Sequence, residues 1–422
     1  MKTIALILFI AAYGLILFLP KRRAVVALAA AAGFVAAGIL DLSGAWGAID
    51  WNVLLTLIGM MGMVTLFIRS QAPAYFADTL ANKVGNAKWI FVLLAIFAGI
   101  VSAFIDNVAT VLMVAPIGLA IARKLKVSPG PVVMAIAVSS NLQGAATLVG
   151  DTTSILLGGR LGMDFLDFFV WDHRPGMFFV VQAGMLATVP VLLYLFRRSS
   201  ASVEKSAQTP VKDWVPTFLL AGTVAALIAA SFIPSKPAET NGLICVGFMI
   251  LGLIWTTVRE KSTEALLSCI KEIDWTTLLL LTGLFIVIEG IVQAGIVADI
   301  SAMIAKMGSS NLFLTYTVIV WASVLLSAFI DNIPYVAAML PVVGGVGEAL
   351  GIDVTVLYFG LLAGATLGGN LTPIGASANI AAAGILSKEG YTVSNREFMR
   401  IGVPFTLAAV VTGYILIWFL YV

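Results

Sequence analysis

The sequence predicts an all-helical membrane protein made of two inverted copies of one unit, with about ten transmembrane spans, two re-entrant hairpins and two discontinuous helices. Of its 422 residues, 60% are hydrophobic and only 11% are charged, and the mean hydropathy is +1.05. That is too little polar surface to cover a water-soluble globule of this size. Apolar runs of membrane-spanning length recur along the chain, and one six-residue motif occurs twice.

The first two apolar runs, 3–20 and 24–42, are separated by the basic triplet Lys21-Arg22-Arg23. A cleaved signal peptide carries its positive charge before the apolar run, so we interpret 3–20 as the first span. The positive-inside rule places the triplet in the cytoplasm and the N-terminus outside. The span 51–68 then returns to the cytoplasm, and the partly polar stretch 71–87 suits a helix at the membrane interface.

The next apolar stretch, 89–123, is interrupted at its centre by Asp106-Asn107. Each arm has about 15 residues, too short for a full span, so a re-entrant hairpin is predicted that enters and leaves on the cytoplasmic side. The following segment, 131–158, carries the polar sequence SNLQGAATLVGDTTS in its interior. It predicts a helix broken inside the membrane, whose polar backbone must face a cavity or buried protein.

The rest of the chain repeats this order. A span at 176–196 completes the first repeat, 1–198, and a Ser-, Lys- and Pro-rich cytoplasmic linker at 199–213 leads to the second repeat, 214–422. The second repeat contains spans at 214–233, 242–258 and 275–292, a hairpin at 311–348, a broken helix at 354–386 and a last span from 401. We expect a multi-pass protein of the cell inner membrane with both termini external.

The repeat itself rests on identical residues at a constant spacing. SAFIDN at 102–107 recurs at 327–332, an offset of 225 residues, and Gly144 and Thr147 recur as Gly369 and Thr372. The pair Asp50-Trp51 recurs 224 residues later as Asp274-Trp275. The charge pattern predicts that the two copies of the span that begins there cross the membrane in opposite directions. Inverted repeats with discontinuous helices are typical of secondary transporters, which bind solute near the midplane between the copies.

Asp106 and Asp331 are the central site candidates, because an ionised carboxylate inside the membrane costs at least roughly 2.5 kcal/mol unless it is paired or hydrated. Each aspartate either caps the helix that follows it or binds an ion or proton at the cavity. The neighbouring asparagines can donate and accept hydrogen bonds. The predicted substrate- or ion-binding residues are Asp106, Asn107, Asn141, Thr147, Asp151, Thr152, Asp331, Asn332, Asn370, Thr372, Ser377 and Asn379.

Asp151 has no acidic counterpart, because residue 376 is alanine, so the two half-sites are expected to differ chemically. Basic residues are missing from 326–387, and within 101–159 only Arg123, Lys124 and Lys126 occur. A multiply charged anion would therefore depend on helix dipoles alone, and a neutral or cationic solute is easier to accommodate.

The two cysteines and the single histidine form no metal-ligand pattern, so we expect no metal site. Enzymatic activity is not expected either, since a hydrolase would need a nucleophile with a positioned base, and the lone His173 falls in a predicted external loop. We expect no cofactor, and we expect the proton motive force to supply the energy for transport.

The motifs GDTTS at 150–154, GNLTPIGASANIAAAGI at 369–385 and YTVSNREFMRIGVPF at 391–405 resemble the ion transporter superfamily. Within it they are similar to the arsenical pump membrane proteins and the pink-eyed-dilution-type permeases. The dicarboxylate carriers of that superfamily have Ser-Asn-Thr at the hairpin tips, whereas this chain has Ile-Asp-Asn. This difference argues against a dicarboxylate substrate.

The resemblance implies proton-coupled efflux of arsenite and antimonite, with an elevator-like movement of the hairpins and broken helices against the other spans. Its expected partners are a small inorganic solute, protons and the lipid bilayer, with no nucleic acid. It leaves open a homodimer and a soluble ATPase subunit. The alternatives are a sodium/proton antiporter, an anion or dicarboxylate transporter of the same superfamily and, from another class, an anion channel.

Overall fold

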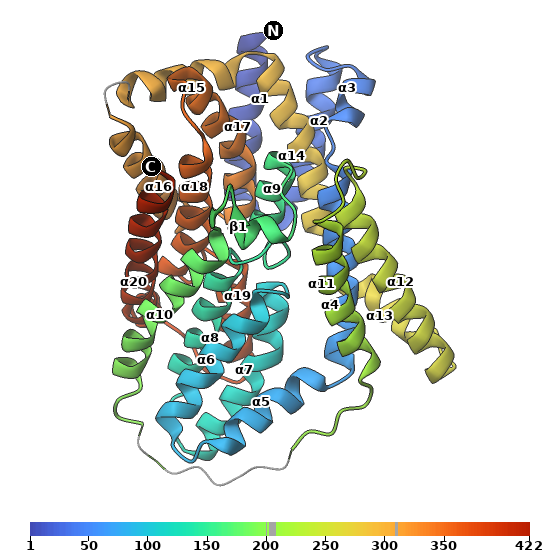
Figure 1. The fold of residues 1–422 in the computed structure, drawn as a ribbon, viewed down its shortest axis with the longest axis vertical. Helices are drawn as coiled ribbons and strands as arrows, with labels where there is room; N and C mark the ends of the chain where they lie inside the picture. Colours follow the sequence, from blue (N-terminus) through green and yellow to red (C-terminus); the bar gives the residue numbers. More distant parts are fainter. Residues whose placement is uncertain (200, 202–207, 309–310) are drawn as a thin grey trace.

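The computed structural model describes the whole chain except residues 200, 202–207 and 309–310, so part of the predicted linker 199–213 lies outside the described residues. The described chain is almost entirely helical (Figure 1). It also has one antiparallel pair of two-residue strands, β1 (Val170–Trp171) and β2 (Arg174–Pro175). The predicted all-helical architecture is confirmed, including both hairpins and both discontinuous helices.

The helices of the first half are α1 Lys2–Phe18, α2 Arg23–Ala36, α3 Leu42–Gly47, α4 Trp51–Arg69, α5 Ala72–Lys83, α6 Ala87–Ser102, α7 Asn107–Lys124, α8 Gly130–Gln143, α9 Thr152–Leu161 and α10 Met177–Leu195. Those of the second half are α11 Val215–Ala230, α12 Thr240–Glu260, α13 Glu264–Glu272, α14 Trp275–Gln293, α15 Ile296–Gly308, α16 Leu312–Ser327, α17 Asn332–Leu350, α18 Thr355–Gly368, α19 Ser377–Lys388 and α20 Asn395–Tyr421. Three short 3₁₀ segments, Pro20–Arg22, Leu166–Phe168 and Gly369–Leu371, join some of them.

The helix lengths correct two expectations. Among the described residues, seven helices are long and apolar enough to cross a membrane, and these include α7 and α17, the second arms of the two hairpins. α7 has 18 residues, more than the 15 predicted for an arm of the first hairpin, because the helix starts at Asn107 and continues to Lys124; its counterpart α17 has 19. In contrast, α2 has only 14 residues and is shorter than the predicted span.

The two hairpins are copies of each other in detail as well as in outline. The first, α6 and α7, turns at 103–106, and the second, α16 and α17, turns at 328–331. In each copy a threonine of the broken helix donates a hydrogen bond to a carbonyl at the hairpin tip, Thr147 to Ala103 and Thr372 to Ala328. In Figure 1 the first hairpin occupies the lower part of the molecule and the second the upper part. The sequence repeat is thus also a repeat of tertiary contacts.

Glycines let the remaining spans pack closely in pairs. α4 lies against α12, where Gly59 faces the backbone of Cys245, and α14 lies against α2, where a Cβ on Gly283 would be 2.6 Å from the carbonyl carbon of Ala27. Small residues at such crossings allow membrane helices to gain van der Waals contact. Gly59 and Gly283 are related by the 224-residue offset, so this packing is duplicated too.

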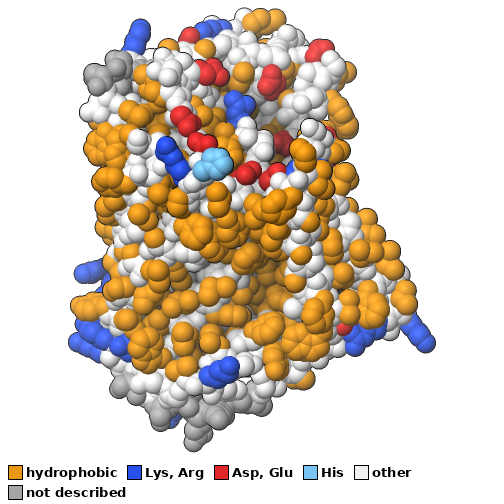
Figure 2. Space-filling view, in the orientation of Figure 1, with side chains coloured by type: hydrophobic (Ala, Val, Ile, Leu, Met, Phe, Trp, Pro, Cys, Tyr) orange, Lys and Arg blue, Asp and Glu red, His pale blue; other side chains and the backbone are white. Residues whose placement is uncertain are grey.

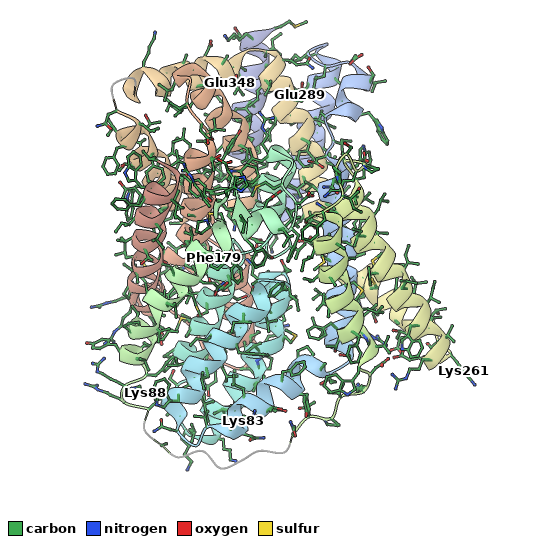
Figure 3. The ribbon with its side chains drawn as sticks, viewed as in Figure 1. Lys83, Lys88, Phe179, Lys261, Glu289 and Glu348 are labelled. Carbon is green, nitrogen blue, oxygen red and sulfur yellow. The ribbon has the colours of Figure 1, made fainter. Side chains whose placement is uncertain are left out.

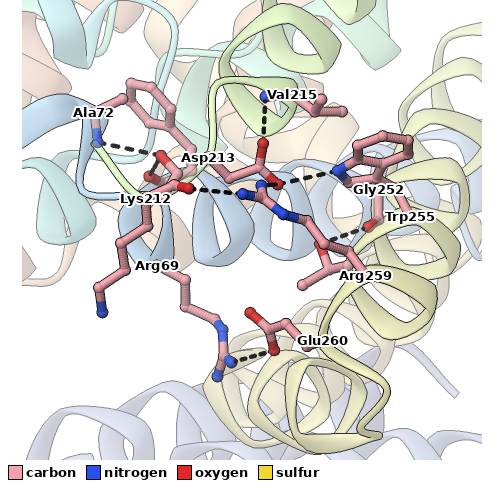
Figure 4. A network of polar contacts seen from close by, with 12 residues as sticks. Arg69, Ala72, Lys212, Asp213, Val215, Gly252, Trp255, Arg259 and Glu260 are labelled. Atoms are coloured by element: carbon pink, nitrogen blue, oxygen red, sulfur yellow. Dashed lines mark hydrogen bonds and ion pairs between the residues drawn. The ribbon is translucent and has the colours of Figure 1, made fainter. Parts of the chain in front are cut away.

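A polar network ties the ends of α4 and α12 to the segment before α11 (Figure 4). Arg69 pairs with Glu260 at 3.1 Å, and Asp213 pairs with Arg259 and accepts a hydrogen bond from the Val215 N–H at 3.0 Å. Partial burial alone would raise the pKa of Asp213, but these bonds outweigh it and hold the pKa below its usual value.

The surface has the polarity of a protein that crosses a membrane. Figure 2 shows a broad band of hydrophobic side chains around the middle of the molecule, with Lys and Arg gathered near the lower rim. Lys83, Lys88 and Lys261 lie at this lower end and Glu289 and Glu348 at the upper end (Figure 3).

Candidate functional site

The first hairpin meets both broken helices through a chain of amide side chains. Asn107 donates to the side-chain oxygen of Asn141 at 3.0 Å. Asn141 in turn donates to the Thr366 carbonyl at 2.7 Å and to Asn370 Oδ1 at 3.1 Å, and Asn370 donates to the Val138 carbonyl at 2.9 Å. These side chains are buried, and their mutual hydrogen bonds satisfy polar groups that would otherwise be costly at this depth.

The second hairpin meets the first broken helix at Asp151. This residue precedes α9, where one carboxylate oxygen accepts the Thr152 N–H at 2.8 Å. The other oxygen accepts the Thr153 hydroxyl at 3.0 Å and the Asn332 amide at 3.3 Å. Asp151 therefore caps a helix and also joins the two repeats.

A cavity of about 190 Å³ lies where these elements converge, several times the roughly 15 Å³ that one buried water needs. Its wall comes from the C-terminal half of α4, the starts of α7, α9, α17 and α19, and the junction of α13 with α14. The polar side chains that line it are Thr65, Asp106, Asn107, Asp151, Thr152, Glu272, Asp274, Thr277, Asn332 and Ser377. Of the described side chains that line it, none is Lys, Arg or His.

The predicted site residues divide into three groups. Those that line the cavity are Asp106, Asn107, Asp151, Thr152, Asn332 and Ser377. Those held in hydrogen bonds behind it are Asn141, Thr147, Asn370, Thr372 and Asn379. The amide of Asn379 donates to the carbonyls of Gly369 and Thr372, while its buried side-chain oxygen has no hydrogen-bond partner among the described atoms.

Asp331 is the remaining predicted residue, and its surroundings differ from those of Asp106. Both cap their helices, through Ile333 N–H at 3.1 Å and Ala109 N–H at 3.0 Å respectively, as the capping interpretation expects. Asp331, however, forms an ion pair with Arg23 at 2.6 Å, whereas Asp106 faces the cavity.

Basic residues are missing from 326–387, but α2 brings the guanidinium of Arg23 to Asp331 of the second hairpin. The same guanidinium donates to the Thr277 hydroxyl at 3.3 Å. Thr277 donates onward to Asp274 at 2.6 Å, so a polar chain runs from the second hairpin to the cavity wall. The basic triplet was interpreted only as a topology signal, and no sequence spacing links residue 23 to residue 331.

The polar lining residues that sequence reasoning missed are Thr65, Glu272, Asp274 and Thr277. Asp274 belongs to the repeated pair Asp50-Trp51 and Asp274-Trp275, which served above only as evidence of the repeat. A duplicated aspartate at the start of a predicted span was a usable signal.

The two copies are in different packing states. α9 packs against α4, and a Cβ on Gly159 would lie 2.5 Å from Asp50 Oδ2. The counterpart of Gly159 is Gly384 on α19, and a Cβ there would have no neighbour within 4 Å. The counterpart of Asp50 is Asp274, which lines the cavity. One broken helix is therefore docked on its partner span, and the other is not.

Two inverted repeats, paired hairpin tips and broken helices around one polar cavity define a membrane transporter. The sequence matches the citrate transporter (CitMHS) family over residues 13–364, most of the chain. The chain therefore belongs to this family, which lies within the ion transporter superfamily, and the predicted likeness to the arsenical pump proteins is not established by the match.

Relatives agree with the family, and a solved structure shares the fold. An uncharacterized transporter of Mycobacterium tuberculosis is 31% identical over 436 residues, which cover 100% of this chain and 99% of that protein. The human P protein is 26% identical over 499 residues, and the aligned part covers 97% of this chain and 59% of that protein. The crystal structure of the Alcanivorax borkumensis YdaH transporter shares the fold with a TM-score of 0.59 and 13% identity, over 88% of this chain and 86% of that one.

Proposed function

We propose that the chain is a secondary active transporter that exchanges protons for a small solute, and that this solute is arsenite or antimonite in the direction of efflux. The observation that carries the proposal is the cavity itself. Protonatable carboxylates, Asp106 and Asp151, lie there beside the amides of Asn107 and Asn332. Arsenite is an uncharged trihydroxide near neutral pH, and amide and hydroxyl groups suit its oxygens.

The charge of the cavity supports a neutral or cationic solute over free citrate, the solute in the family's name. Four carboxylates, Asp106, Asp151, Glu272 and Asp274, line it, and Arg23 is already paired with Asp331. A multiply charged anion would meet like charges at short range, and that repulsion is strong where water is scarce. The carboxylates equally favour a second candidate, sodium/proton antiport.

Transport by this proposal uses the difference between the copies. The hairpins and broken helices move together against the other spans, so that α19 docks on the start of α14 as α9 now docks on the start of α4. The cavity then closes on one side and a matching one opens on the other, which is alternating access. Positive-inside orientation would place the basic lower end in the cytoplasm and both termini outside.

The test is uptake into everted membrane vesicles under an imposed proton gradient, with arsenite, citrate and sodium offered separately. Arsenite accumulation that Asp106→Asn abolishes supports the proposal. The matched control is Asp41→Asn, because Asp41 is also a helix-capping aspartate but is exposed and does not line the cavity. Both changes keep a capping side chain, since Asn caps helices about as well as Asp.

The outcomes distinguish the candidate solutes and test the role of Asp106. Sodium-linked proton movement without arsenite accumulation would select the antiporter, and citrate accumulation would show that the acidic cavity does not exclude a polyanion. Gradient-driven arsenite uptake that persists in Asp106→Asn would refute the assigned role of Asp106.

A further inference from the structure

A second cavity lies at the basic end of the molecule, between the last turn of α10 and the first turns of α20. Its volume is about 590 Å³, and the start of α8 closes one side. Pro190, within α10, and Pro404, within α20, line it. None of its lining residues belongs to the transport cavity.

Three exposed arginines surround this cavity: Arg197, Arg198 and Arg400. Glu397 is the one acidic lining residue, which leaves an excess of positive charge. No ion pair to any of the three arginines is present in the part of the chain that the structure describes. Guanidinium groups bind phosphate through paired N–H donors, so this cluster suits a phosphate-bearing anion.

Arg197 is also preorganised. Its guanidinium lies 3.7 Å from the ring centroid of Tyr194, and one of its N–H groups donates to the Tyr194 carbonyl at 2.9 Å. The described residues offer no acceptor to its remaining N–H groups, and an ordered arginine loses less entropy when it binds. Tyr194 is itself 66% exposed, and tyrosine is characteristic of the membrane interface, where an apolar ring meets polar head groups.

The helices beside the arginines present apolar surface. On α10 Leu186 is 71% exposed, and on α20 Leu407 and Val411 are 42% and 40% exposed. A soluble phosphate would make no use of these side chains, whereas acyl chains would cover them. We propose that this cavity binds the head group of an anionic membrane lipid, with the arginines on its phosphate and the acyl chains along α10 and α20.

Such a lipid would connect the parts that carry the transport cavity. The segment after α10 is bonded to the start of the first hairpin, since the N–H groups of Ala87 and Lys88 donate to the carbonyls of Ala201 and Ser199 at 3.0 and 2.8 Å. α10 and α20 also both pack on α8, which carries Asn141. A head group bridging α10 and α20 therefore stabilises the folded protein, which makes the melting temperature a usable signal of binding.

The experiment uses the purified full-length chain in neutral detergent and measures its melting temperature as phosphatidylglycerol or phosphatidylcholine is added. Phosphatidylglycerol is expected to raise the melting temperature, and phosphatidylcholine is not. Replacing Arg197, Arg198 and Arg400 together by Gln should weaken the apparent affinity for phosphatidylglycerol about 100-fold, as three basic contacts to an anionic head group imply. The single variant Arg400→Gln, with a smaller loss, serves where the triple variant does not fold.

The matched control replaces three other exposed basic residues, Lys83, Lys261 and Lys271, by Gln and so removes the same charge. It should keep the response to phosphatidylglycerol. An equal loss in this control would mean that binding follows net charge and would overturn the site. Inorganic phosphate that stabilises as well as the lipid would overturn the lipid assignment. In the unchanged protein, about 1 M salt should suppress the effect, because the screening length falls to about 3 Å.

Discussion

The two broken helices offer a direct test of alternating access, because one glycine is crowded and its counterpart is free. In Gly159→Ala the new Cβ would lie 2.5 Å from Asp50 Oδ2 and 2.9 Å from Val53 Cγ2, so the docked position of α9 would have to shift. Overpacking of this kind costs about 1–3 kcal/mol. The change should therefore disfavour the present conformation about 5–150-fold relative to its alternative. In Gly384→Ala the new methyl group meets nothing here and should obstruct only the alternative conformation, where it would approach Asp274.

Accessibility of the transport cavity reports which conformation is present. A cysteine introduced at Thr65, which lines that cavity, can be labelled with a small thiol reagent in membrane vesicles. The native Cys245 and Cys269 are 0% and 1% exposed and should give little background. Gly159→Ala is expected to slow labelling, and Gly384→Ala to leave it unchanged or raise it. Equal labelling of both variants and the parent would refute the reasoning.

Three further predictions follow from individual contacts. Arg23→Gln removes the ion pair with Asp331 and should lower the free energy of unfolding by about 1–3 kcal/mol. Adding Asp331→Asn to this variant should restore part of the loss. If thermal denaturation shows that the effects of the two substitutions simply add, the residues are not directly coupled. Gly59→Ala should lower the melting temperature because its Cβ would meet the α12 backbone, while Gly14→Ala, with open space around it, should not. Asp213→Asn should destabilise the protein near neutral pH, because the lowered pKa of Asp213 in the folded state stabilises the fold only while the carboxylate is ionised. The difference in melting temperature between the variant and the parent should shrink below about pH 4 and disappear as the pH falls through the folded-state pKa.

The fold was predictable because a membrane-spanning chain must meet strict requirements on helix length and on the pairing of buried polar groups, and both leave a pattern in the sequence. Long apolar runs mark helices, and polar interruptions inside them mark places that need buried partners. The repeated SAFIDN motif then gave both hairpins at once, and the structure shows why it is repeated. In each copy the serine of the motif contacts the broken helix, the alanine carbonyl accepts a threonine hydroxyl of that helix, and the aspartate caps the helix that follows.

The composition of the cavity was only partly predictable, because its walls come from segments that no local pattern connects. Asp106 and Asp151 stood out as charges inside apolar segments, but Glu272 lies at the end of α13, where a charge is unremarkable in sequence. Arg23 follows the first span and obeys a topology rule that gave no reason to look for a tertiary partner. Their roles depend on how the second repeat folds back on the first, which is tertiary information.

The two hairpin aspartates have different partners, so the duplicated site is chemically asymmetric in this conformation. Arg23 holds Asp331 in an ion pair, so this carboxylate is already occupied by a cation of the protein. Among the described residues Asp106 has no such ion pair, and it faces the cavity with Asp151, Glu272 and Asp274. In the proposed transport cycle, movement of the second hairpin away from α2 would release Asp331 from Arg23. The ion pair would then link the conformation of the protein to which hairpin aspartate is held by a cation.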